Sequence, residues 1–274
     1  MNEQKQDNSG FKTVAIITAV VGGIALIGSG TTAAFGAVNA LGQGNGSDQS
    51  DRVDVSGVTE LIADVAASDV TIRFGDVDEA ELQVSGSDGR WTLERDGDEL
   101  KLRSPDSWLS WGGDWSWFGD WGRDENVDLL LPQELVGIDA DLSLGAGALD
   151  VEGEFGEFEV DISAGSVHVN GSATALDAEL NAGRAEFELA DVDTASFGVS
   201  AGELVSTLTG SAPREVEVGV SAGSLTLALP DVPYDVTQDV SAGSVDNDLQ
   251  TASNSRNSVR VDVSAGNVKL RTSD

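Results

Sequence analysis

The segments VSAGEL (199–204), VSAGSL (220–225), VSAGSV (240–245) and VSAGNV (263–268) repeat one short pattern in the second half of the chain. The pattern consists of an aliphatic residue, a small or polar residue, alanine and glycine. Looser copies extend it upstream, and the spacings between successive glycines are 18, 18, 19, 21, 20 and 23 residues. The seven Ala-Gly pairs are Ala146-Gly147, Ala164-Gly165, Ala182-Gly183, Ala201-Gly202, Ala222-Gly223, Ala242-Gly243 and Ala265-Gly266. A fixed pattern at a near-constant spacing is the signature of a repeat protein.

The residues around each glycine alternate between apolar and polar, which is typical of β-strands. Val216, Val218 and Val220 alternate with polar residues before Gly223, and the alternation resumes one residue out of phase after it. A shift of phase at a glycine predicts a corner at which the chain turns while its apolar side stays inward. We expect the alanine to fit a crowded inner angle and the glycine to adopt a backbone conformation that a Cβ would penalise.

A coil of 18–23 residues cannot bury its own inner face, but coils stacked at about 4.8 Å per rung can do so. A β-propeller blade needs a longer repeat, and the consensus of leucine-rich repeats is absent. The sequence therefore predicts an all-β fold, a single-strand parallel β-solenoid of about 18–23 residues per coil, preceded by one transmembrane helix.

The region upstream of the clear repeats also contains strand patterns. Segments 69–74 (DVTIRF), 81–85 (ELQVS) and 126–131 (NVDLLL) are predicted strands, and 91–102 is a predicted hairpin that turns at 96–98. We therefore predict one extracytoplasmic domain over residues 51–274.

The N-terminal region predicts a membrane anchor. Residues 14–41 contain no charged side chain and are long enough to span a hydrocarbon core of about 30 Å. Lys5 and Lys12 precede the stretch, so the positive-inside rule leaves residues 1–13 in the cytoplasm as a short tail. Residues 42–50 form a linker, and the protein is predicted to be a single-pass protein of the plasma membrane with its bulk outside. A signal peptide cleaved near 38–40, giving a secreted protein, is the alternative.

The tryptophan-rich loop, residues 104–124, interrupts the strand pattern. Its aromatic residues are Trp108, Trp111, Trp115, Trp117, Phe118 and Trp121. Three interpretations remain open. The loop caps an open end of the solenoid, it binds a protein or glycan partner through its indoles, or it inserts into the outer leaflet. The net charge of −3 on the loop opposes docking to anionic lipid.

The composition excludes several kinds of function. The 274 residues include no cysteine, which excludes thiol chemistry. The chain carries a net charge of −33, which opposes binding to nucleic acid. The only histidine, His168, lies between two inward valines and is expected to face solvent. No catalytic, metal-binding or cofactor-binding motif occurs, so neither an enzyme activity nor a cofactor is predicted.

The four VSAG segments, together with an acidic strand-rich start and one membrane span, resemble the putative adhesin family of bacterial β-strand-repeat proteins, a DUF4097-like family of unknown function. The resemblance covers about residues 53–270 and implies a solenoid at the cell surface or in the envelope. We therefore expect a surface display, adhesion or partner-binding module. The alternative is a regulatory protein that senses envelope stress and acts through a membrane partner.

Overall fold

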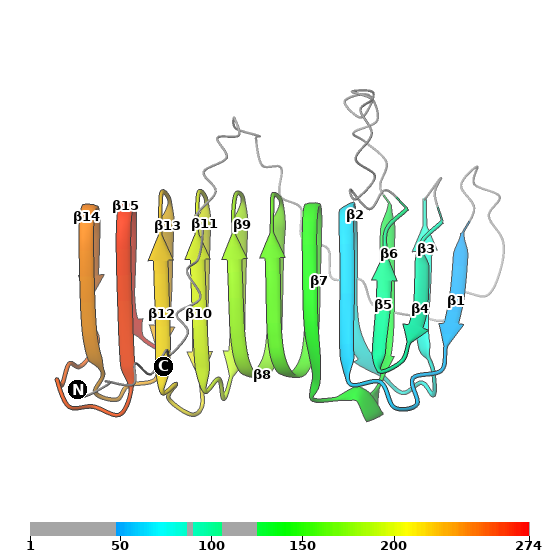
Figure 1. Cartoon of the computed structure of the whole chain (residues 1–274), viewed down its shortest axis with the longest axis horizontal. Helices are drawn as coiled ribbons and strands as arrows, with labels where there is room; N and C mark the ends of the chain where they lie inside the picture. The colour runs from blue at the N-terminus through cyan, green and yellow to red at the C-terminus, as the bar shows by residue number, and fades with distance from the viewer. Residues whose placement is uncertain (1–47, 87–89, 106–124, 274) are drawn as a thin grey trace, which may run out of the picture. The chain divides into compact units, whose positions relative to one another are not determined.

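The computed structural model describes residues 48–86, 90–105 and 125–273 (Figure 1). The chain divides into two units, Met1–Asn39 and Ala40–Asp274, and every described residue belongs to the second. No helix among the described residues is long and apolar enough to cross a membrane. The predicted anchor at 14–41 lies outside the described residues, as do the tail and most of the linker.

The described residues form β-strands and one short 3₁₀ helix, η2 (Gln133–Leu135). The strands are β1 (Gln49–Val53), β2 (Glu60–Gly75), β3 (Ala80–Ser85), β4 (Thr92–Asp96), β5 (Glu99–Arg103), β6 (Asn126–Pro132), β7 (Ile138–Ile162), β8 (Ser166–Leu180), β9 (Arg184–Ala190), β10 (Thr194–Val199), β11 (Glu203–Thr209), β12 (Glu215–Val220), β13 (Ser224–Leu229), β14 (Asp235–Asn247) and β15 (Ser258–Thr272). The all-β, solenoid-like prediction is confirmed.

Each coil contributes one rung with two strand segments, one in each of two facing layers. The segment before the corner lies in layer 1 and the segment after it lies in layer 2, as with β10 and β11. Neighbouring rungs pair in parallel, so that β10 pairs with β8 and β12 while β11 pairs with β9 and β13. Strands β2, β7, β14 and β15 continue through their corners, and β8 continues through the opposite edge of the stack, so these strands belong to both layers.

The core lies between the two layers and consists of ladders of apolar side chains. One ladder in layer 1 runs through residues at the same register position in successive rungs: Leu100, Leu61, Ala140, Phe158, Leu176, Ala195, Val216 and Val259. All eight are at most 4% exposed. Phe187 of β9 and Phe197 of β10 have ring centroids 6.5 Å apart, so the layers meet across this core.

The N-terminal end of the stack is closed by antiparallel strands. β4 and β5 form the predicted hairpin, with Gly97 at φ 71° between Asp96 and Glu99. β3 pairs antiparallel with β6 in layer 2, and β1 pairs antiparallel with β3. The predicted strands at 69–74, 81–85 and 126–131 fall within β2, β3 and β6.

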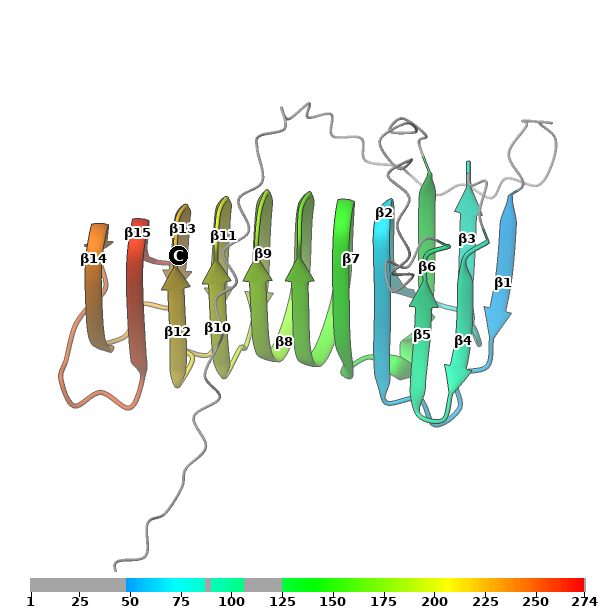
Figure 2. The same cartoon turned by 45° about the horizontal axis from the view of Figure 1, so that its top comes forward.

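The C-terminal end departs from sequence order. β15 inserts between the β12–β13 rung and β14, so β14 is the last rung although β15 is the last strand (Figures 1 and 2). The inward side chains explain this order. Gln238 and Asn247 occupy positions at which β15 carries Val261 and Leu270. Burying two side-chain amides without partners is unfavourable, and the terminal rung avoids that burial.

Candidate functional site

The corners between the layers lie along one edge of the stack, and the structure places all seven predicted Ala-Gly pairs there. Adjacent corners are joined by backbone hydrogen bonds. The N–H of Ala222 donates to the carbonyl of Ser200 at 2.9 Å, and the N–H of Ser224 donates to the carbonyl of Gly202, also at 2.9 Å. The edge is therefore a regular hydrogen-bonded ladder.

The glycine of each corner is required both by its backbone angle and by the neighbouring rung. Gly223 has a φ of 147°, and a Cβ on it would lie 2.6 Å from the carbonyl oxygen of Gly202. Gly202 has a φ of 139°, and its Cβ would lie 2.5 Å from the carbonyl oxygen of Gly183. That oxygen is held in place because it accepts the hydrogen bond of the next rung. Only glycine permits this spacing.

The corner alanines do not occupy a crowded inner angle, so that expectation was wrong. Ala146, Ala164 and Ala182 are half-buried, whereas Ala201, Ala222, Ala242 and Ala265 are exposed. Their methyl groups form part of the outer surface of the edge. The crowding predicted for alanine falls on the glycine instead.

The structure contains an eighth corner of this kind at residues 65–68 (VAAS). Val65, Ala67 and Ser68 are in register with Leu144, Ala146 and Gly147. Later rungs need glycine at this position because the short corner of the preceding rung lies against it. The rung that precedes β2 has no short corner, so Ser68 has room for a side chain. The small residues at 66–68 were the sequence signal for this corner.

The tryptophan-rich loop occupies the position of a corner. β5 pairs in parallel with residues 60–64 of β2, and β6 pairs in parallel with residues 69–75. β5 and β6 are therefore the two segments of one rung, whose corner is the segment 104–125 in place of the four residues 65–68. The indoles and the phenyl ring singled out by the sequence lie outside the described residues, and of the loop itself only Ser104 and Pro105 are described, followed by Glu125 after it.

Both ends of this expanded corner are hydrogen-bonded to β2. The N–H of Ser104 donates to the carbonyl of Asp64 at 3.0 Å, and its Oγ accepts the N–H of Ala66 at 3.0 Å. At the other end, Glu125 accepts hydrogen bonds from the indole N–H of Trp91 and from the Oγ of Ser68. Trp91 is fully buried and also exchanges two hydrogen bonds with Gln49. The segment therefore begins and ends at anchored residues.

The outer face of layer 1 carries many carboxylate side chains. β7 and β8 place Glu159 beside Asp177 and Asp161 beside Glu179, and no lysine or arginine occurs between residues 124 and 183. The pKa values of Glu159, Asp161 and Glu179 are raised above their usual range. The main cause is partial burial, and repulsion from neighbouring acids is the smaller cause. This face repels anions.

His168 lies on the outer side of β8, half-buried, in register with Asp150 of β7 and Glu186 of β9. A shallow depression of about 240 Å³ adjoins it. In the part of the chain that the structure describes, no three His, Cys, Asp or Glu side chains are grouped so as to hold a metal ion.

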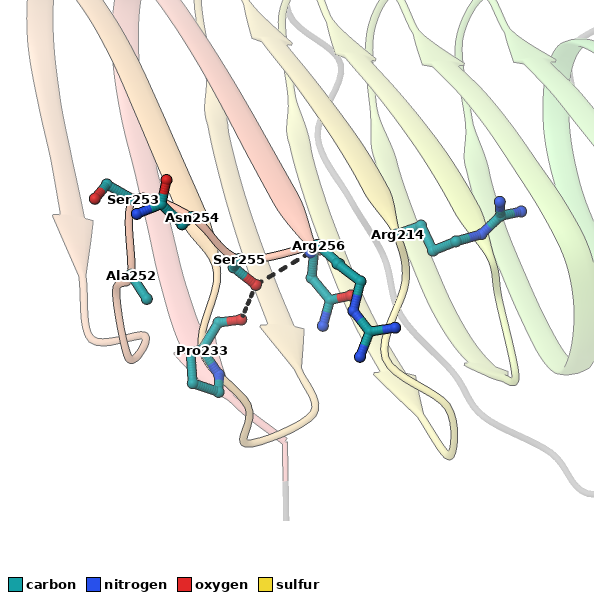
Figure 3. A pocket seen from close by; sticks show the side chains of 8 residues that line it. Arg214, Pro233, Ala252, Ser253, Asn254, Ser255 and Arg256 are labelled. Atoms are coloured by element: carbon teal, nitrogen blue, oxygen red, sulfur yellow. Dashed lines mark hydrogen bonds between the residues drawn. The ribbon is translucent and has the colours of Figure 1, made fainter.

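A larger depression of about 670 Å³ lies beside the return segment from β14 to β15 (Figure 3). Ser255 donates its hydroxyl hydrogen to the carbonyl of Pro233 at 2.7 Å and accepts the N–H of Asn257 at 3.1 Å. Arg214 and Arg256 line it, but their guanidinium groups do not converge, and that of Arg214 pairs with Asp193. The two hydrogen bonds of Ser255 hold the return segment in place.

The described residues thus define a two-layer β-solenoid with a glycine-ordered corner edge, one corner of which is expanded. The chain belongs to the Toastrack DUF4097 family, whose model matches residues 58–274. No curated protein matches it.

Several solved structures are similar over most of their length. A putative adhesin from Parabacteroides merdae is 13% identical, with a TM-score of 0.43, over 83% of this chain and 97% of that one. A putative cell adhesion protein from Clostridium sporogenes is 11% identical, with a TM-score of 0.33, over 83% and 99%. A putative lipid binding protein from Parabacteroides distasonis is 15% identical, with a TM-score of 0.34, over 82% and 98%.

Proposed function

We propose that this chain is a membrane-anchored, extracytoplasmic, non-enzymatic module for surface display, adhesion or partner binding. The expanded corner carries this proposal. A corner that needs four residues at 65–68 is replaced by a segment with five tryptophans, and both ends of that segment are tied to the scaffold. Indole side chains presented from a rigid support lose little conformational entropy on binding and dominate binding hot spots.

The partner-binding residues in this proposal are Trp108, Trp111, Trp115, Trp117, Phe118 and Trp121. The partner is a protein or a glycan, since the carboxylates of the segment and of layer 1 oppose nucleic acid and anionic lipid. The membrane anchor at 14–41 and the external position of the β-domain are supported by hydropathy and by the position of Lys5 and Lys12.

The test compares the chain with two variants for co-sedimentation with envelope fractions. In one variant the five tryptophans of the loop are changed to serine. In the other, residues 106–124 are replaced by two glycines, so that the anchoring residues Ser104 and Glu125 are kept. We expect both variants to lose binding while keeping the unfolding temperature of the parent. Binding that survives in both variants would contradict the proposal. Loss of stability without any binding in the parent would assign the loop to a capping role.

The orientation is tested with a single cysteine, because the natural chain has none. Ser244 is exposed on β14, so Ser244→Cys should react with an impermeant maleimide on intact cells. Reaction only after lysis would place the domain in the cytoplasm and exclude the surface role.

A further inference from the structure

Residues 250–252 bond to the backbone of Tyr234 directly before β14, and from Val236 onward the outer edge of β14 has no strand partner among the described residues. β14 pairs with β15 alone, over twelve register positions (Figure 1). The N–H of Asp235 donates to the carbonyl of Asn257 at 2.8 Å, on the β15 side. Because backbone groups alternate in direction along a parallel strand, those of Val236, Gln238 and Val240 point to the free edge. An edge of this kind accepts a further strand.

The core is also less covered at this end than elsewhere. Val220 and Val263 are 2% exposed, whereas Val240, at the same register position, is 40% exposed. The register partner of buried Val261 is the exposed Gln238. At the opposite end, the antiparallel strands and fully buried Trp91 close the stack. A terminal rung with exposed Val240 and half-buried Val236 leaves apolar surface that an added strand can bury.

The charges of β14 determine which kind of added strand fits its free edge. Its charged residues are Asp235, Asp239 and Asp246, with no lysine or arginine. β15, which covers the inner edge of β14, has Arg260, Lys269 and Arg271 with one aspartate. Asp239 is in register with Asp262, so a cation supplied from the free side would relieve this repulsion. A second copy of β14 would instead bring aspartates toward aspartates.

We propose that the free edge of β14 is a docking site for an extended segment of a partner protein in which apolar residues alternate with lysine or arginine. The segment adds the next rung in layer 1 and places one amide side chain opposite Gln238, so that the Gln238 amide keeps a hydrogen-bond partner when it is covered. Its backbone bonds to the free groups of Val236, Gln238 and Val240, its apolar side chains cover Val240, and its cations face Asp235 and Asp239. This site goes beyond the proposed function and is independent of the tryptophan-rich loop.

The probe is a fluorescein-labelled synthetic peptide with the sequence of residues 257–272, the strand that β14 already accepts on its inner edge, with glutamine in place of the valine of position 261 so that an amide faces Gln238. Its binding to the full-length chain is followed by fluorescence anisotropy. We expect saturable 1:1 binding that is weakened about tenfold when the same residues are scrambled to break the alternation. Equal binding of both peptides would reduce the effect to the overall charge of the protein and overturn the proposal.

Two variants locate the site. Gln238→Pro removes an N–H that faces the free edge, a position at which a strand tolerates proline, so binding should be lost while the unfolding temperature is kept. Asp235→Asn with Asp239→Asn should also weaken binding by about tenfold. The matched control, Asp161→Asn with Asp177→Asn, removes the same charge from a distant part of layer 1 and should leave binding unchanged. Equal weakening by both pairs would overturn the proposal.

Self-association of the chain without peptide, abolished by Gln238→Pro, would overturn the proposal by assigning the edge to a second copy. The variant with the five loop tryptophans changed to serine should bind the peptide as the parent does. Failure of the proposed function would therefore leave this result intact.

Discussion

The carbonyl oxygen of Gly202 lies 2.6 Å from the position that a Cβ on Gly223 would occupy. The same clash recurs between the glycines of neighbouring corners along the edge, so each corner sets the steric limit of the next. The repeat is therefore maintained by contact between copies of the same residue.

Gly223→Ala should destabilise the protein by at least about 2 kcal/mol, because it combines a strained φ with contact against a fixed carbonyl. Gly219→Ala is the matched control. Gly219 lies in the neighbouring strand segment, its φ is not positive, and its Cβ would meet nothing closer than 4.0 Å. The control should be neutral or stabilising by about 0.5 kcal/mol. Urea denaturation of both variants checks the pair, and equal free energies of unfolding would refute this account of the corners.

Ser206→Ala should stabilise the protein by about 1 kcal/mol. Ser206 is fully buried in β11, in register with Phe187 and Leu227, and its Oγ has no hydrogen-bond partner among the residues that the structure describes. A buried hydroxyl without a partner keeps its desolvation cost, which alanine removes. Ser196→Ala is the control, because the Ser196 hydroxyl bonds to Asp177 and no gain is expected there. A lower melting temperature for Ser206→Ala would show that the hydroxyl has a partner in solution.

The stability of the protein should rise as the pH falls from 7 toward about 5. The pKa values of Glu60, Asp128, Asp141, Glu159, Asp161, Asp177 and Glu179 are raised by burial, with further repulsion from neighbouring acids at several of them. The folded state therefore binds more protons than the unfolded state in the window above their usual values of 3.8 and 4.5, and stability falls as the pH rises through it.

Below this window the trend should reverse. Hydrogen bonds from Lys101, Ser211 and Arg214 lower the pKa values of Asp96, Asp191 and Asp193, so their contribution is lost as the pH falls. Asp161→Asn should flatten the rise between pH 7 and 5. Chemical denaturation at a series of pH values provides the measurement, and a stability that climbs steadily from pH 5 to 7 would contradict the prediction.

Trp91 should report unfolding of the N-terminal end by itself. The chain has six tryptophans, so changing the five in the loop to serine leaves Trp91 alone. Because Trp91 is fully buried, its emission should be blue-shifted and should move to the red on unfolding. Adding Trp91→Phe should cost about 1–3 kcal/mol, since Glu125 loses its indole donor. This loss is followed by circular dichroism, and an unchanged melting temperature would show that the bond contributes nothing.

The sequence was sufficient to predict the solenoid, because alternation and the Ala-Gly pairs are local signals. It did not reveal that the tryptophan-rich loop is a corner. That relation depends on β5 and β6 both pairing with β2, which is a long-range register. The crowded residue was also misassigned, since the clash at Gly223 involves an atom of another rung. The order of β14 and β15 was hidden by their identical VSAG corners, although Gln238 and Asn247 carried the distinguishing signal.

The insertion of β15 between β13 and β14 has a consequence for the assembly of the chain. A stack that adds rungs in order of synthesis can grow only as far as β13. β14 emerges next, but its neighbour in the stack is β15, which follows it in the chain. The finished fold is therefore reached only when residues 258–272 are present, and a chain that stops short of them leaves β14 with no partner on either side. Folding at this end of the stack therefore requires one strand to enter beside another that was made before it.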